Sequence, residues 1–142
     1  MSLLKLNKIT YSETGNTLVE TMASIAIFVF ILSAVMNVAV TSASMGKRSE
    51  FAYTAYNLAK NHLETLRSMP YSNLANAAET ESYIDANGVS DPDGPYIRST
   101  AISQNYNSDA NLIQVTVSVK YIFRGEMTNN PISLSTVIFQ YA

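Results

Sequence analysis

Residues 21–46 read TMASIAIFVFILSAVMNVAVTSASMG and contain no charged side chain. A helix needs about 20 apolar residues to cross the hydrocarbon core of a bilayer, which is about 30 Å thick. The remainder of the chain is polar, with the alternation and turn residues of a water-soluble domain. The sequence therefore predicts one membrane-competent helix near the N-terminus, followed by a single domain in water.

The composition excludes most classes of catalytic site. Charged residues make up 14% of the chain, against about 25% in a typical soluble domain, and the net charge of −2 argues against broad electrostatic binding of nucleic acid. Because there is no cysteine, disulfides and thiolate metal sites are excluded, and the single histidine, His62, excludes sites built from several histidines. Phosphate-binding and nucleophile-elbow motifs are absent, so we expect neither an enzyme nor a cofactor. We expect His62 to be a partly exposed helix residue rather than a catalytic base.

Three interpretations compete for the apolar segment. The first is a cleaved secretory signal, with Thr41-Ser42-Ala43 as the cleavage site, although the apolar stretch exceeds the usual core of 7–15 residues. The second is an uncleaved signal anchor. The third depends on the residues that come directly before the segment.

A carboxylate, Glu20, lies at the start of the apolar segment. An acidic side chain costs about 2.5–3.5 kcal/mol at the centre of a membrane helix, so a partner is expected for it. No basic side chain lies within two helical turns of Glu20. If the chain were cut after Gly15, the new α-amino group of Asn16 would lie four residues away. In a bundle of identical helices, that ammonium group can meet the Glu20 carboxylate of a neighbouring chain.

The run Gly15-Asn16-Thr17-Leu18-Val19-Glu20, followed by an apolar helix, resembles the type IV prepilin signal. The family pattern is a short basic leader, a glycine at the cut, usually phenylalanine or methionine, then Thr-Leu-Ile/Val-Glu and about 20 apolar residues. The leader here carries Lys5 and Lys8, and the chain departs from the pattern at Asn16. The resemblance implies cleavage by the prepilin peptidase between Gly15 and Asn16, N-methylation of Asn16, and a role in assembly for Glu20.

A second stretch resembles one subgroup of the family. The resemblance as a whole covers residues 1 to about 70. Residues 55–67 read AYNLAKNHLETLR and are similar to the I-type minor pseudopilins of type II secretion and to the V-type minor pilins. Major members of the family usually have a proline where this chain has Asn37; without it, no helical hydrogen bond is lost there. The implied partners are other pilin or pseudopilin subunits, the prepilin peptidase/methyltransferase and the assembly platform of the inner membrane.

The sequence beyond the apolar segment predicts an α+β fold. Apolar residues recur at spacings of three and four through residues 47–68, which indicates a helix with one buried face, and Pro70 ends it. An unbroken helix from Thr17 to Ser68 would be about 78 Å long. Alternating residues predict a strand over 113–123, with a hairpin loop at 124–131, a return strand over 132–141 and a weaker strand over 96–104. We expect a three- or four-stranded antiparallel meander packed on the C-terminal half of the helix.

Residues 71–95 are rich in turn residues, and we expect no regular strand among them. Asp85, Asn87, Asp91 and Asp93 are candidate calcium ligands, but their spacing does not fit an EF-hand loop. Because Asp and Asn also stabilise turns, we favour a structural role for these four residues.

Together these features predict three parts: a prepilin leader (1–15), a transmembrane or filament-core helix (16–46) and an extracytoplasmic globular domain (47–142). The predicted function is that of a minor pilin or pseudopilin, and we do not expect nucleic acid among its partners. Its predicted location is the bacterial inner membrane, with a cytoplasmic leader, and then a periplasmic or extracellular filament. The alternative is a single-pass, membrane-anchored extracytoplasmic binding module that does not polymerise. A mature chain that begins at Asn16 is expected only for the filament subunit.

Overall fold

The computed structural model describes residues 14–140, with side chains from Thr17 onward. The predicted leader therefore lies outside the described residues, except at Thr14 and Gly15. The chain divides into two compact units between Ser44 and Met45.

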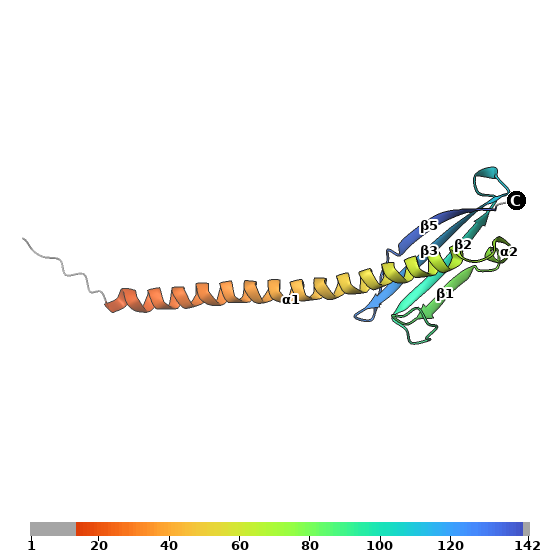
Figure 1. Cartoon of the computed structure of the whole chain (residues 1–142). Coiled ribbons are helices and arrows are strands. Elements are labelled where there is room, and N and C mark those ends of the chain that lie inside the picture. The colour runs from red at the N-terminus through yellow and green to blue at the C-terminus, as the bar shows by residue number, and fades with distance from the viewer. Residues whose placement is uncertain (1–13, 141–142) are drawn as a thin grey trace, which may run out of the picture. The chain divides into compact units, whose positions relative to one another are not determined.

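The first element is the helix α1, Thr14–Arg67 (Figure 1). It confirms the predicted long N-terminal helix, which ends one residue earlier than expected. The last turn is closed by hydrogen bonds from the Ser68 backbone N–H to the Glu64 and Thr65 carbonyl oxygens and from Met69 N–H to the Leu66 carbonyl. Pro70 then disfavours helical geometry at Met69 and begins the short helix α2, Tyr71–Leu74.

Five strands form one antiparallel sheet in the second unit: β1 (Glu79–Ile84), β2 (Tyr96–Gln104), β3 (Leu112–Phe123), β4 (Glu126–Met127) and β5 (Ile132–Phe139). The central strand is β3, which pairs with β2 on one side and with β5 on the other. Val117, for example, lies opposite both Thr100 and Leu134. The α+β fold is therefore confirmed, and so are the strands predicted at β2, β3 and β5.

The sheet has more strands than the predicted three or four, because β1 and the two-residue β4 were not expected. The prediction that residues 71–95 contain no strand is wrong. Strand β1 is mostly polar and its register is broken by a bulge between Glu79 and Ser82, where Glu81 has a φ of 49°. It therefore lacks the alternation that identifies a strand in sequence, and its conformation comes from pairing with β2.

The core lies between the sheet and the part of α1 that belongs to the second unit. The helix contributes Ala55, Leu58, Ala59, Leu63 and Leu66, and the sheet contributes the inward side chains of β3. Ala55 and Ala59 are fully buried. Their small side chains allow the helix backbone to approach the sheet closely, which explains alanine at the centre of this face. At one end of the core, the Phe51 ring contacts Tyr96, Tyr121 and Phe123 at centroid distances of 5.9, 6.1 and 5.8 Å.

Candidate functional site

The residues of the prepilin-like signal lie at the beginning of α1. Gly15 and Asn16 are in its first turn, and Glu20 follows one turn later with an exposed side chain. Residues 1–13 of the predicted leader lie outside the described residues. The proposed cut between Gly15 and Asn16 would therefore leave the Asn16 α-amino group about one helical turn from Glu20.

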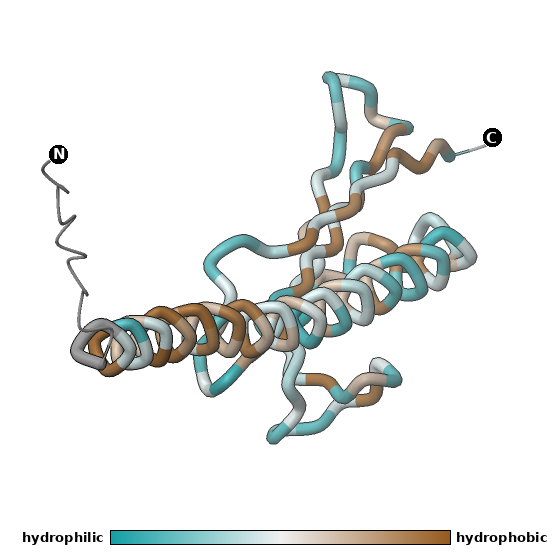
Figure 2. Tube along the Cα trace, turned by 90° about the vertical axis from the view of Figure 1, so that its left-hand side faces the viewer, coloured by the Kyte–Doolittle hydropathy of each residue, from teal (hydrophilic) through white to brown (hydrophobic). Residues whose placement is uncertain are grey.

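The apolar segment of α1 has no cover within its own unit. Its large hydrophobic side chains are all exposed, from Leu32 (48% exposed) to Phe30 (76% exposed). Figure 2 shows the corresponding run of strongly hydrophobic residues along this part of the helix. The helix is long and apolar enough to cross a membrane. An apolar surface of this size is normally covered by lipid or by other proteins.

Three hydroxyl groups within this segment are bonded to the helix's own backbone. Thr21 Oγ1 donates to the Leu18 carbonyl at 2.9 Å, Ser33 Oγ to Phe30 at 2.8 Å and Thr41 Oγ1 to Asn37 at 2.8 Å. Because these groups do not need water as a partner, they lower the cost of placing the helix in hydrocarbon.

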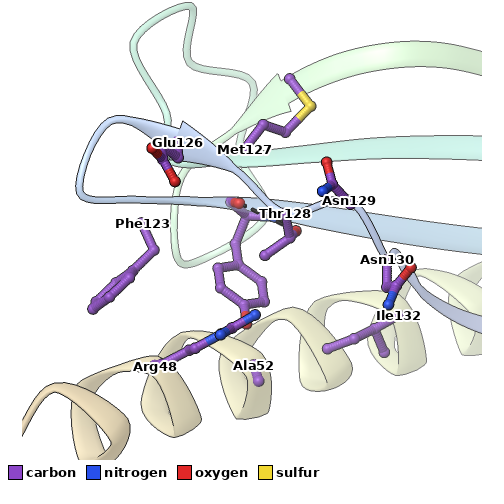
Figure 3. Close-up of a pocket in the computed structure, with 10 residues that line it drawn as sticks. Arg48, Ala52, Phe123, Glu126, Met127, Thr128, Asn129, Asn130 and Ile132 are labelled. Carbon is purple, nitrogen blue, oxygen red and sulfur yellow. Dashed lines mark hydrogen bonds between the residues drawn. The ribbon is translucent and has the colours of Figure 1, made fainter. Parts of the chain in front are cut away.

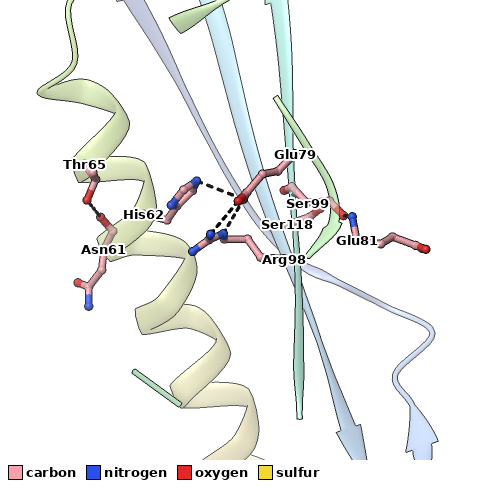
Figure 4. Close-up of polar contacts among 8 residues, drawn as sticks. All are labelled: Asn61, His62, Thr65, Glu79, Glu81, Arg98, Ser99 and Ser118. Carbon is pink, nitrogen blue, oxygen red and sulfur yellow. Dashed lines mark hydrogen bonds and ion pairs between the residues drawn. The ribbon is translucent and has the colours of Figure 1, made fainter. Parts of the chain in front are cut away.

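A partly buried ionic cluster joins α1 to the sheet in the second unit (Figure 4). The Glu79 carboxylate on β1 accepts hydrogen bonds from Arg98 Nε at 2.8 Å and from Nη2 at 2.9 Å. On the helix side, His62 Nε2 lies 3.7 Å from Glu79 Oε2. The hydrogen bonds from Arg98 lower the pKa of Glu79. Burial, followed by the charge of Arg98, lowers the pKa of His62, which favours the neutral form of the imidazole.

This cluster explains the environment of His62, which is mostly buried, with 18% of its side chain exposed. Sequence reasoning missed both partners, because they come from two strands distant in the chain and no short motif links them. The arrangement is that of a structural contact between a helix and two strands. Among the residues from 14 to 140, no group of three or more His, Cys, Asp or Glu side chains is placed to hold a metal ion.

The four candidate calcium ligands lie in the turns between β1 and β2. Asp85 Oδ1 accepts hydrogen bonds from the backbone N–H groups of Asn87 at 2.9 Å and Val89 at 2.8 Å, and Asp91 Oδ1 accepts one from Asp93 N–H at 3.0 Å. The Val89 and Asn87 N–H groups lower the pKa of Asp85. Two of the four side chains, Asp85 and Asp91, therefore stabilise turns.

A pocket that the sequence did not indicate lies within the second unit, between α1 and the β3–β5 connection (Figure 3). Its volume is about 460 Å³. Tyr121, Phe123 and Ile132 supply apolar surface, and the polar lining comes from Arg48, Glu126, Thr128, Asn129 and Asn130. Such a surface can bind a polar molecule.

Comparisons of the chain with protein-family models, with curated proteins and with solved structures find no match.

Proposed function

We propose that this chain is a minor pilin or pseudopilin, a structural subunit of a type IV pilus or of a type II secretion pseudopilus. The observation that carries the proposal is the position of the signal. Gly15 and Glu20 lie at the start of the exposed apolar segment of α1, rather than after it as a secretory cleavage site would. The helix continues into a small folded domain, so removal of the leader would leave the apolar segment attached to that domain.

In this proposal the precursor spans the bacterial inner membrane once, with its leader in the cytoplasm. Lys5 and Lys8 in the leader favour that orientation, although Lys47 and Arg48 lie on the opposite flank. The prepilin peptidase cuts after Gly15, Asn16 becomes the methylated N-terminus, and the assembly platform moves the subunit into a periplasmic or extracellular filament. The apolar surface passes from lipid to neighbouring helices.

Glu20 would fix the axial position of the subunit in the filament. In the membrane its exposed carboxylate can stay at the headgroup level and remain hydrated. In a helical bundle that water is lost, and an unpaired charge costs several kcal/mol unless the Asn16 ammonium group of a neighbour compensates it. Pairing therefore favours one register over the others, which provides specificity more than net stability.

The mass of the mature protein tests the cleavage step. We expect the chain purified from membranes to begin at Asn16, and Gly15→Val to leave an uncut, membrane-bound precursor. A mature chain that begins at Ser44 would support the secretory signal and would exclude the filament subunit.

Substitutions at Glu20 test the assembly step. Glu20→Ala and Glu20→Gln should be cleaved and membrane-bound like the wild type, but their content in purified filaments should fall sharply. Glu50→Gln is the matched control, because Glu50 is also an exposed carboxylate on α1 but lies beyond the apolar segment. Normal incorporation of both Glu20 variants would remove this role.

The pocket beside Arg48 supports a second candidate, a membrane-anchored extracytoplasmic binding module that does not polymerise. Its polar lining, with one cation and one carboxylate, suits a small zwitterionic or hydroxylated ligand. This candidate predicts no cut after Gly15, so the same mass measurement separates the two functions.

A further inference from the structure

Asn37 is the most polar side chain in the middle of the apolar segment, and it lies exposed on α1. The Asn37 backbone carbonyl accepts the Thr41 hydroxyl. Within the described part of the chain, however, the Asn37 side-chain amide has no hydrogen-bond partner. It therefore differs from Thr21, Ser33 and Thr41, whose hydroxyl groups are bonded to the backbone of their own helix.

The depth of Asn37 makes this amide costly in a membrane. Asn37 is separated from both ends of the uncharged segment 21–46 by at least two helical turns. Its side chain is too short to reach the headgroups from there, and hydrocarbon offers it no partner. A polar side chain in this position is stabilised by a hydrogen bond to another helix.

We propose that Asn37 pairs two copies of this chain in the membrane, with the amide N–H of each copy donated to the amide oxygen of the other. This inference rests on the membrane location in the proposed function. Copies of one chain insert with the same orientation, so their Asn37 side chains lie at the same depth. The amide contains both a donor and an acceptor, which makes a pair of identical side chains self-complementary.

The side chains around Asn37 allow two copies of the helix to approach each other closely. Ser33 lies one turn before it and Thr41 one turn after it, on the same side of the helix. Both are small, and their hydroxyl groups are already satisfied, so two helices can come close along this side. Ala39 lies on roughly the opposite side at nearly the same depth and supplies a control position.

Disulfide cross-linking of the full chain in membranes tests the pairing, and the absence of native cysteine gives a clean background. The chain is expressed in cells that lack pilus and pseudopilus genes, and single cysteines are introduced as Ser33→Cys or Ala39→Cys. After oxidation we expect a dimer band for Ser33→Cys that is several times stronger than the band for Ala39→Cys. In the Ser33→Cys background, Asn37→Leu should lower dimerisation about three- to fifteen-fold, the range of polar contacts between membrane helices, whereas Asn37→Gln should retain it.

Equal cross-linking at the two positions, or an unchanged dimer with Asn37→Leu, would overturn the pairing. The pairing and the proposed function are tested separately, because the mass of the mature chain is measured in cells that contain the prepilin peptidase. A chain that begins at Asn16 but shows no dependence on Asn37 would refute only the pairing. An Asn37-dependent dimer of a chain that is never cut after Gly15 would refute only the filament subunit.

Discussion

Glu79→Gln removes the charge that holds Arg98 against the sheet while keeping the size of the side chain. In the wild type, Arg98 donates two hydrogen bonds to the Glu79 carboxylate, at 2.8 and 2.9 Å. The glutamine carbonyl can accept only one of these bonds, and its amide group presents hydrogens to the second donor. Arg98, which is 13% exposed, would then be a largely buried cation without a counter-ion.

The expected loss of folding free energy follows from the two hydrogen bonds and from the exposure of the Glu79 side chain. A hydrogen bond to a charged group contributes about 1.5–3 kcal/mol to stability. Because 31% of the Glu79 side chain is exposed and solvent screens it, we expect the lower part of that range, about 1.5–2 kcal/mol. In a domain of about 100 residues this corresponds to a decrease in melting temperature of about 6–16 °C.

The effect should depend on pH in a defined direction. Arg98 lowers the pKa of Glu79 in the folded state, so this stabilisation is complete above the ordinary value of about 4.5 and is lost as the pH falls through the folded-state pKa. Burial lowers the pKa of His62, so the unfolded chain takes up a proton first, and stability begins to fall below about pH 6.5. His62→Gln should therefore reduce the loss of stability between pH 7 and about 5.5.

The assay is thermal unfolding of the fragment from Met45 to Ala142, followed by circular dichroism from pH 7 to pH 3. Glu64→Gln is the matched control, because Glu64 forms an exposed pair with Arg67 at 3.4 Å, where the two side chains are 56% and 53% exposed. We expect that control to change stability by less than about 0.5 kcal/mol. Equal effects of Glu79→Gln and Glu64→Gln at pH 7, or a Glu79→Gln effect that is undiminished at pH 3, would refute the reasoning.

Three further results are expected from the second unit. Leu66→Ala should cost about 2–5 kcal/mol in urea unfolding because Leu66 is 1% exposed, whereas Tyr53→Ala, at a side chain that is 68% exposed, should change stability by less than about 0.5 kcal/mol. Gly94→Ala should destabilise the fragment by about 1–3 kcal/mol, because its Cβ would overlap the Ile84 backbone carbonyl; an unchanged unfolding midpoint would show that this turn can move. The fragment should sediment as a monomer, since the uncovered apolar helix lies outside it, and specific oligomers would show that other surfaces drive association.

Local sequence pattern was sufficient to predict a helix or strand where the two sides of that element differ chemically. The uncharged run at 21–46 predicted the apolar helix, and the three- and four-residue spacing after it predicted the face that packs on the sheet. In β3, alternation from Ile113 to Phe123 predicted a half-buried strand, and its inward residues form the centre of the core. The candidate signal at Gly15, Asn16 and Glu20 is also a local pattern, and the structure adds that Glu20 is exposed.

Pairing between distant segments decided the strand register, the existence of β1 and the contacts of the buried charges. Strand β5 carries apolar residues on both faces, so its sequence leaves the register open. Pairing with β3 turns Ile132, Leu134 and Ile138 toward the core and leaves Val137 exposed. Strand β1 is mostly polar, and only its hydrogen bonds to β2 make it a strand. The same pairing brings Glu79 beside Arg98 and both toward His62. Local sequence does not indicate such contacts, because the partners of hydrogen bonds and buried charges come from distant segments that meet only in the folded chain.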